Sequence, residues 1–143
     1  MQRQLPLWIG GAGEKRTLRT AARFADGWNA PYLAPAEWKR KNEVLDRWCA
    51  EVGRDGHAIA RTVNVGFYMG ADAKGAARGE ERFQREWGAD TRGFTGFLRG
   101  TPERAAALEE AGEAERVNIA VRSGPYDWDA LEAFAQNVVP ALS

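Results

Sequence analysis

Apolar and polar residues follow two periods along the chain, and segments of the two kinds alternate. A short apolar run or period-two alternation, the pattern of a strand, occurs at residues 5–9, 26–31, 60–70 and 116–121. Helical spacing separates and follows these segments, at residues 14–24, 36–52, 73–87, 101–111 and 126–142. The glycine-rich residues 88–100 predict a loop with a short helix.

Most of these segments have one apolar face that we expect to be buried. The positions with this spacing are Leu18, Ala21, Ala22 and Ala25; Trp38, Val44, Leu45, Trp48 and Val52; Val63, Val65, Phe67 and Met69; and Leu131, Phe134, Ala135 and Val138. Strand followed by helix, about four times over, is the pattern of a parallel α/β sheet.

The length of the chain limits which α/β fold it can form. Each strand–helix unit takes roughly 35 residues, whereas a complete eight-unit barrel needs on the order of 250. The 143 residues therefore predict a single domain over residues 1–143. We expect a partial (β/α)8 TIM barrel of about four βα units, or else a small open-sheet domain.

Composition and charge exclude several classes of partner. The chain is 44% hydrophobic, with 20 basic and 20 acidic residues, so we expect neither nucleic acid nor an anionic membrane as a partner. It has no apolar run of membrane-spanning length and no secretory signal pattern. Cys49 is the one cysteine, which fits a reducing cytoplasm, and the single histidine, His57, predicts no metal site.

Three glycines stand between the first predicted strand and the first predicted helix. Gly10, Gly11 and Gly13 let the backbone turn sharply and approach a ligand closely, at the strand end where α/β folds bind ligands. The amides near Gly13, Glu14 and Lys15 then form a helix N-terminus, which binds phosphate well. The alternative is a tight turn without a ligand. The pattern fits neither the dinucleotide fingerprint nor a P-loop.

Few other residues suggest chemistry. Arg122 follows the strand at 116–121, so it lies near the same end of the sheet, where it would bind a phosphate or carboxylate. The alternative is a salt bridge to Asp127 or Asp129. Asn64 and Asn118 are polar residues within strands, facing either the site or solvent. No positioned nucleophile is evident, so we assign no catalytic residue.

Four segments carry a resemblance to a known family. "LPLWIGGAGEKRTLRTAARFADGWNA", "RKNEVLDRWCAEVGRD", "GTPER" and "ERVNIAVRSGPYDWDALEAFAQNVVPAL" are similar, in this order, to segments of luciferase-like monooxygenases, particularly of the branch that uses coenzyme F420. The resemblance covers most of the chain and is least clear over residues 70–99.

The resemblance implies an F420- or flavin-dependent oxidoreductase or monooxygenase that acts on a small organic substrate. The family has a (β/α)8 barrel with a reduced deazaflavin or flavin at the C-terminal ends of its strands. Its Gly-Gly-x-Gly turn lies against the cofactor phosphate, which assigns Gly10, Gly11, Gly13 and the amide of Glu14 to cofactor binding. The implied cofactor is F420, with FMN as the alternative.

The chain also departs from the family pattern. The matching segments belong to the second half of the barrel, and the half that supplies most of the ring pocket and the proton donors has no counterpart. We therefore expect a C-terminal half-barrel, a fragment of the longer family pattern. Such a half-barrel has two open sheet edges, so we expect a homo-oligomer or pairing with a missing half-barrel. The alternative function is a non-catalytic phosphate-binding or interaction module.

Overall fold

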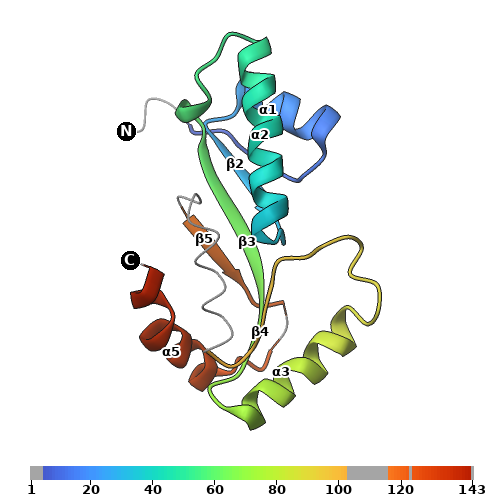
Figure 1. The fold of residues 1–143 in the computed structure, drawn as a ribbon, viewed down its shortest axis with the longest axis vertical. Coiled ribbons are helices and arrows are strands. Elements are labelled where there is room, and N and C mark those ends of the chain that lie inside the picture. Colours follow the sequence, from blue (N-terminus) through green and yellow to red (C-terminus); the bar gives the residue numbers. More distant parts are fainter. Residues whose placement is uncertain (1–4, 103–115, 123, 143) are drawn as a thin grey trace.

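Five parallel strands form one sheet in the computed structural model, which describes residues 5–102, 116–122 and 124–142. The strands are β1 (Trp8–Gly10), β2 (Gly27–Pro31), β3 (Ala60–Met69), β4 (Phe97–Gly100) and β5 (Arg116–Ala120). Strand β3 is the centre of the sheet and pairs with β2, β4 and β5, while β1 pairs with β2 (Figure 1). The prediction of a parallel α/β fold is confirmed.

Strands β2 and β4 lie end to end along the same edge of β3. The first half of β3 pairs with β2 and its last residues pair with β4, and the amide of Gly96 donates to the carbonyl of Tyr32, just past β2. Strand β5 spans the junction, from Thr62 to Gly66, and so occupies the opposite edge. The four strands in barrel order are therefore β1, β2, β3 and β5, and β4 is an addition.

The described helices follow the predicted positions with two differences. They are a π-helical turn at Glu14–Leu18 that continues into α1 (Arg19–Phe24), then α2 (Pro35–Glu51), α3 (Ala73–Glu86) and α5 (Trp128–Asn137), with 3-10 turns at Gly56–Ala58 and Val139–Leu142. The short helix predicted within residues 88–100 is wrong, because β4 forms there instead. The last helix is shorter than predicted and ends in a separate turn. Most of the helix predicted at 101–111 lies outside the described residues.

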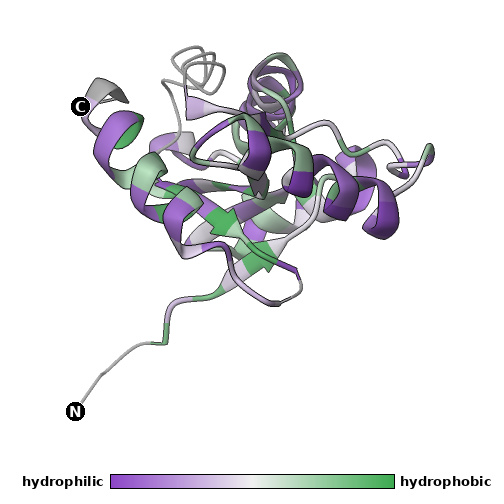
Figure 2. Ribbon diagram, turned by 90° about the horizontal axis from the view of Figure 1, so that it is seen from below, coloured by the Kyte–Doolittle hydropathy of each residue, from purple (hydrophilic) through white to green (hydrophobic). Residues whose placement is uncertain are grey.

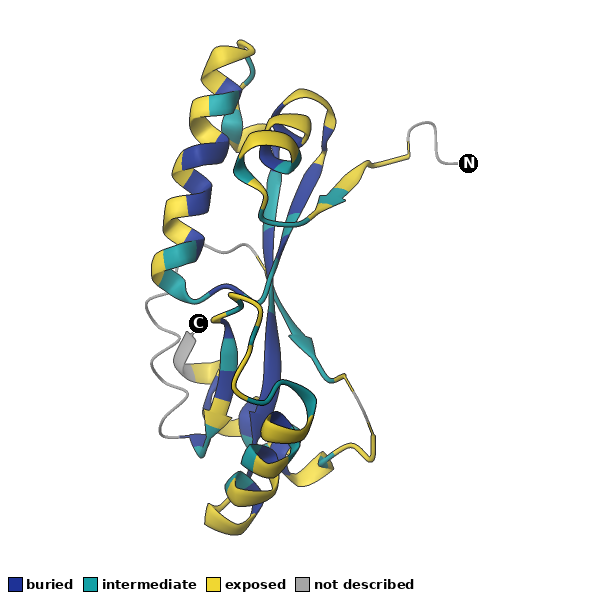
Figure 3. Ribbon diagram, turned by 90° about the vertical axis from the view of Figure 1, so that its right-hand side faces the viewer, coloured by how far each residue is buried: buried dark blue, intermediate teal, exposed yellow. Residues whose placement is uncertain are grey.

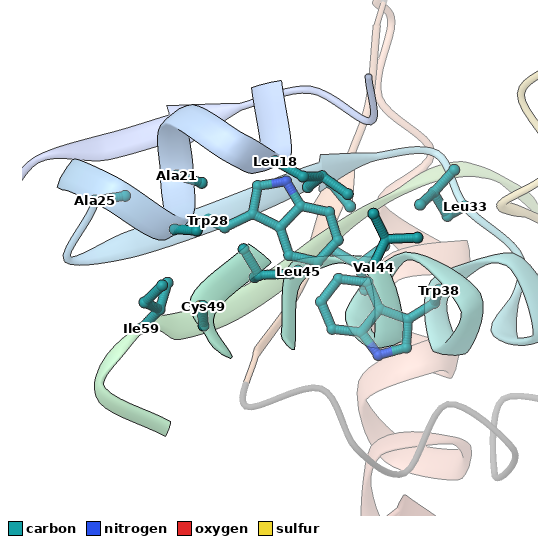
Figure 4. Close-up of a cluster of buried hydrophobic side chains, with 13 residues drawn as sticks. Leu18, Ala21, Ala25, Trp28, Leu33, Trp38, Val44, Leu45, Cys49 and Ile59 are labelled. Atoms are coloured by element: carbon teal, nitrogen blue, oxygen red, sulfur yellow. The ribbon is translucent and has the colours of Figure 1, made fainter. Parts of the chain in front are cut away.

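One face of the sheet packs against helices and forms the core. Around β2, side chains from α1 and α2 enclose Trp28, whose ring stacks on that of Trp38 at 5.1 Å (Figure 4). Around the end of β3, Phe67 packs edge-to-face on Phe134 of α5. Figure 3 shows burial along most of β3, and Figure 2 shows polar residues dominating the outlying helices.

Most of the predicted buried positions are confirmed. Trp48 and Leu131 are half-buried. Two are wrong: Val52 is 41% exposed because α2 has already ended at Glu51, and Ala135 is exposed. Helix α5 buries Ala130, Phe134 and Val138 at a spacing of four, which turns Ala135 away from the sheet.

The other face of the barrel strands carries small and polar side chains. Because Ile9, Trp28, Val63 and Val117 pack on the helix side, their neighbours along each strand face the opposite way. These inward residues are Trp8, Gly10, Gly27, Asn29, Pro31, Thr62, Asn64, Gly66, Arg116, Asn118 and Ala120. In a closed barrel this face is the interior.

Helix α3 approaches β3 so closely that a side chain is excluded at the contact. A Cβ added to Gly79 would lie 2.1 Å from the carbonyl oxygen of Tyr68. Helical glycine normally costs stability relative to alanine. At position 79 glycine is required, because the backbones of the helix and the strand are in direct contact.

We expect Gly79→Ala to destabilise the fold by roughly 1–3 kcal/mol, because the added methyl overpacks against the backbone of β3. Ala77→Gly, at an exposed position of the same helix, is the control and should also destabilise, by about 1 kcal/mol. Helix propensity alone predicts opposite signs for the two variants. Urea denaturation measures both, and a stabilised Gly79→Ala protein would contradict the contact.

Candidate functional site

The C-terminal ends of parallel strands lie on one side of a sheet, and the predicted site residues gather there. Gly10, at the end of β1, leads into the glycine turn, and Arg122 follows β5 shortly after its last residue. Tyr32, which was not predicted as a site residue, follows β2 at the same end of the sheet. This is the side on which barrels of this kind carry their active sites.

Hydrogen bonds from β2 fix the glycine turn. The amide of Gly11 donates to the carbonyl of Asn29 at 3.1 Å, and the indole Nε1–H of Trp28 donates to the carbonyl of Gly11 at 2.7 Å. Gly11 has φ +121°, a conformation that L residues with side chains rarely adopt. The turn is therefore held in one shape, and glycine at position 11 is required by the backbone.

The helix after the glycine turn begins with a π-helical turn, in which hydrogen-bonded residues are five positions apart. Its opening bond runs from the amide of Leu18 to the carbonyl of Gly13 at 3.0 Å, which is the five-residue spacing of a π-helix. The amides of Glu14, Lys15 and Arg16 precede this bond and belong to the orphan donors of a helix N-terminus. Together with the helix dipole they favour an anion at the turn.

Helix α2 anchors the first residue of this helix. The Glu14 carboxylate accepts hydrogen bonds from Lys41 at 2.8 Å and pairs with Arg40 at 2.6 Å, and the Trp48 indole donates to the Glu14 carbonyl at 2.8 Å. The hydrogen bond from Lys41, with the charges of Lys41 and Arg40, lowers the pKa of Glu14. The acidic side chain is thus neutralised by α2, while Lys15 and Arg16 remain exposed beside the turn.

The turn fits a phosphate group on three counts. A Cβ built on Gly10 would meet nothing closer than the Asn29 carbonyl at 3.9 Å, so a ligand can approach the backbone directly. Helix amides provide donors, and two exposed cations lie next to them. The side chain of Thr17 lies close behind the turn, 3.0 Å from where a Cβ of Gly13 would sit.

A small polar network lies on the inward face of the sheet. The Asn29 carboxamide oxygen accepts from the Thr62 hydroxyl at 2.8 Å and from the Asn118 amide at 3.2 Å. Asn64 pairs in register with Asn118. The two asparagines considered from the sequence, Asn64 and Asn118, therefore lie on the inward face. These groups can position a polar ligand, but none of them titrates near neutral pH.

Aromatic side chains gather past the end of β2 and beside the second half of β3. Tyr32, Trp87, Phe94 and Phe97 make mutual ring contacts, most of them edge-to-face, at 5.1–5.8 Å. The exposed guanidinium of Arg122 lies over the Trp87 ring, 4.4 Å from its centroid. Arg122 is thus held at the rim of the sheet by a cation–π contact.

The salt bridge considered as an alternative for Arg122 forms with neither Asp127 nor Asp129, both of which are described residues. Asp127 caps α5 through the amide of Ala130 at 3.0 Å and pairs with Arg78 at 3.2 Å. Arg122 therefore keeps its charge available beside the aromatic group.

Tyr68, on the inward side of β3, is buried within the same region. Its hydroxyl donates to the Glu86 carboxylate at 2.6 Å and accepts from the Trp87 indole at 2.7 Å. Burial, reinforced by the hydrogen bond to Glu86, raises the pKa of Tyr68 to about 12. The hydroxyl stays protonated at neutral pH and ties α3 to the sheet.

Two residues that support the turn were not expected from the sequence as site residues: Trp48 and Asn29. Their apolar spacing or strand position predicts burial equally well without any hydrogen bond to the turn. The order Gly-Gly-x-Gly followed by Asp-Gly-Trp-Asn was the only available signal that the turn and β2 work together.

A separate hollow of about 530 Å³ lies between α3 and the segment that follows β5. Arg78, Arg82 and Arg85 line it from one side, and Tyr126 and Trp128 from the other. The glycine turn takes no part in its walls.

Metal and membrane sites were also considered over the described part of the chain. It holds no cluster of three histidine, cysteine, aspartate or glutamate side chains suited to a metal ion. None of its helices has both the length and the apolar character needed to cross a bilayer.

Comparison with known proteins finds similarity in both sequence and fold. A family profile described as luciferase-like monooxygenase matches residues 1–134. An F420-dependent secondary alcohol dehydrogenase, solved with an F420–acetone adduct, superposes with a TM-score of 0.77 at 15% identity, covering 99% of this chain and 50% of that one. A search of curated protein sequences finds no match.

Two further solved structures differ in cofactor. A coenzyme F420-dependent tetrahydromethanopterin reductase from Methanopyrus kandleri has a TM-score of 0.67 at 17% identity, covering 97% of this chain and 51% of that one. A riboflavin lyase solved with modified FMN and riboflavin has a TM-score of 0.69 at 12% identity, covering 99% and 43%. The chain thus spans about half the length of the solved relatives it matches, which are TIM-barrel enzymes.

We expect the ultraviolet titration of the tyrosines to include a late step near pH 12, which belongs to Tyr68 because burial and the hydrogen bond to Glu86 raise its pKa. Because the native state holds the Tyr68 proton more tightly than the unfolded state, the stability it contributes is complete below pH ~10 and is lost as the pH rises through 12.

Ultraviolet titration of tyrosinate measures this step, with Tyr68→Phe as the control that removes it. Denaturant unfolding at several alkaline pH values should show a shallower loss of stability for Tyr68→Phe than for the wild type. Ionisation of all tyrosines in one step near the ordinary value would contradict the buried hydrogen-bond network.

Proposed function

Because the chain belongs to the luciferase-like monooxygenase family, we propose that it supplies the cofactor-phosphate-binding half of an F420- or flavin-dependent oxidoreductase. The turn Gly10–Gly13 and the amide of Glu14 bind the phosphate of F420 or of FMN. The observation that carries the proposal is the turn itself, which presents bare backbone and helix amides and is locked by the Trp28 indole.

Each residue of the site has a separate part in this binding. Gly10 and Gly11 keep side chains away from the phosphate, and the amides that follow Gly13 donate hydrogen bonds to it. Lys15 and Arg16 add positive charge from the exposed side of the helix. Since α2 already fixes the helix start, little conformational entropy is lost when the phosphate binds.

The bound cofactor supplies hydride transfer to or from a small organic substrate, and the protein positions the two. The inward amides of Asn29 and Asn118 and the hydroxyl of Thr62 orient polar groups inside the barrel. Arg122 is proposed to contact a phosphate or carboxylate at the rim, because its guanidinium is exposed next to the strand end. No residue is assigned the transfer of a proton.

One observation favours a second candidate, a non-catalytic half-barrel that binds a phosphate ligand or a protein partner. The described inward residues include no histidine, aspartate, glutamate or cysteine, and Tyr68 holds its proton up to about pH 12. A half-barrel of this kind is proposed to bind the cofactor without turnover. The enzyme and the module share the phosphate turn and differ in turnover.

The proposed compartment and assembly follow from chemistry already described. Cys49 is buried, and burial raises the pKa of its thiol, which suits a protein kept reduced in the cytoplasm. Among the described residues, β1 and β5 each pair on one side only, so the chain is proposed to function as a homo-oligomer or paired with another half-barrel.

We expect FMN to bind about tenfold or more tightly than riboflavin, which lacks the phosphate, and F420 to exceed its phosphate-free deazaflavin in the same way. Gly11→Ala should abolish this preference, because the added Cβ strains a residue at φ +121° and displaces the amides behind it. Fluorescence titration measures all four ligands.

The control is Gly53→Ala, which also places a side chain at a positive φ, +68°, at the far end of α2. Gly53→Ala should lose about 1 kcal/mol of stability, and Gly11→Ala should lose more, because φ +121° lies outside the left-handed region that alanine tolerates. Only Gly11→Ala should lose the preference for the phosphorylated ligand. Equal binding of FMN and riboflavin by the wild type would rule out the phosphate site. Turnover of a substrate with bound cofactor would separate the enzyme from the module.

A further inference from the structure

We propose that the substrate is a carboxylic acid with a flat apolar body. Arg122 binds its carboxylate, and the rings around Trp87 contact its body. The assignment of this ligand as the substrate rests on the proposed oxidoreductase function, because it places the ligand near the C-terminal ends of the strands, where the cofactor is proposed to react. The binding site itself stands on contacts among the described residues.

Arg122 turns toward the inward face of the sheet rather than toward the unpaired edge of β5. It follows inward Ala120 by two residues, and its guanidinium lies 4.4 Å from the centroid of the Trp87 ring on α3. Its charge also reaches the hydroxyl of Tyr68, an inward group of β3, where it opposes the larger effect of burial on the pKa. The position of the guanidinium is therefore set by α3 and β3 of its own chain.

The contact with the indole leaves the hydrogen-bond donors of Arg122 available. A cation–π contact uses the charge of a guanidinium and none of its five N–H donors. Arg122 donates to no other described residue and lies within ion-pair distance of no described carboxylate. Its paired donors match the two oxygens of a carboxylate in a bidentate pair.

A second arginine shows what a guanidinium over a ring does where an acceptor is present. Arg99 lies over the Phe83 ring, 4.0 Å from its centroid, and its Nε and Nη2 donate to the Glu80 carboxylate at 2.7–3.0 Å. Arg122 has the ring but, among the described residues, no such carboxylate. We therefore assign the acceptor of Arg122 to the ligand.

Rings from α3, β4 and the end of β2 form an apolar surface beside Arg122. The Trp87 ring lies 5.1–5.7 Å from those of Tyr32, Phe94 and Phe97, in edge-to-face contacts. All four rings are half-buried, so part of each ring stays accessible. Rings arranged in this way bind flat apolar groups through further stacked or edge-to-face contacts.

The backbone holds Tyr32 in this group of rings. Its φ is +46°, which is uncommon for a residue with a side chain. Its amide donates to the Asn64 carbonyl at 2.8 Å, and its carbonyl accepts from the amides of Thr95 and Gly96 at 2.9 and 2.7 Å. The end of β2 is thus tied both to β3 and to the segment before β4, and the rings are in place before a ligand binds.

The rings adjoin the polar network of the inward face. A Cβ built on Gly66 would lie 2.6 Å from the Phe97 ring, so this ring covers the inward side of Gly66. Asn64 precedes Gly66 by two residues on the same face and is in register with Asn118. A ligand on the rings therefore has the Arg122 guanidinium toward the strand ends and the asparagine amides on the other side.

The charge of the site favours a carboxylate over a phosphate. A single guanidinium matches one negative charge, whereas phosphate groups carry up to two and are usually bound by clusters of cations. The Glu86 carboxylate, which accepts from the Tyr68 hydroxyl next to Trp87, repels a dianion more than a monoanion. Because Arg122 is exposed, its charge alone contributes little in water, and the rings must contact the ligand as well.

Four small probes test this combination of charge and ring contact. 3-Phenylpropionate has both, its amide lacks the charge, acetate lacks the ring, and phenyl phosphate carries a second charge. Two-dimensional NMR follows the indole N–H signal of Trp87, which Trp87→Phe identifies by removing it. We expect 3-phenylpropionate to bind about tenfold more tightly than each of the other three.

Three variants separate the role of Arg122 from a general effect of charge. Arg122→Gln should lower the affinity for the acid to that for the amide and leave amide binding unchanged. Arg122→Lys keeps the charge without the paired donors, so it should restore only part of the preference. Arg99→Gln is the matched control: Arg99 also lies over a ring, but Glu80 already occupies its donors, so neither affinity should change.

The carboxylate site is overturned by equal affinity for the acid and the amide, by tighter binding of phenyl phosphate, or by a preference that survives Arg122→Gln. None of these results affects the preference for FMN over riboflavin, which tests the phosphate turn. If the chain binds the acid through Arg122 but shows no preference for a phosphorylated cofactor, the proposed phosphate function fails and the carboxylate site stands.

The assignment of the acid as substrate is tested with FMN or F420 bound, whichever the protein prefers. 3-Phenylpropionate should then change the visible absorption spectrum of the cofactor, because a substrate lies against the reactive ring. Arg122→Gln should require about tenfold more acid for the same change. An unchanged spectrum at a saturating concentration of the acid overturns the assignment.

Discussion

The backbone hydrogen bonding of β3 is the constraint on which the rest of the structure depends. This one strand pairs with β2, β4 and β5, so three separate parts of the chain take their positions from it. Its outward side chains pack into the core beneath α1, α2 and α5. Its inward side chains are polar along the first half of the strand, whereas Tyr68, near the end, packs against Phe83 of α3. The strand is ten residues long, long enough to pair with β2 and β4 in succession along one edge.

The glycine turn shows how packing and binding use the same residues. Trp28 fills the core beneath α1 and α2, stacked on Trp38, and its one polar atom reaches the Gly11 carbonyl. Trp48 does the same from α2 toward Glu14. Hydrophobic burial supplies the free energy that keeps these indoles in place, and the indoles hold the turn in its shape. A site built this way is formed before any ligand arrives.

The sequence predicted the order and type of most elements because their apolar periodicity is strong. Strand β4 was missed because Phe97–Gly100 is short and lies among glycines, so its pairing with β3 depends on tertiary contacts that no local pattern records. Gly11 and Gly13 were predicted as site residues because a sharp turn between a strand and a helix needs backbone conformations that glycine adopts easily. The contact of Arg122 with Trp87 could not be predicted, because the two residues are far apart in sequence. The sequence indicated a salt bridge to a nearby aspartate as an alternative.

The helix-covered core consists of two clusters that meet along β3. One contains Leu18, Trp28 and Val63, and the other contains Val65, Phe67 and Phe134; half-buried Val117 touches both. The glycine turn belongs to the first cluster, and Arg122 follows a strand that packs on the second. The two clusters therefore share the backbone of β3 at Asn64, which pairs with Pro31 on one side and with Asn118 on the other. Because Val117 packs on both clusters, a change of packing in one of them bears directly on the other.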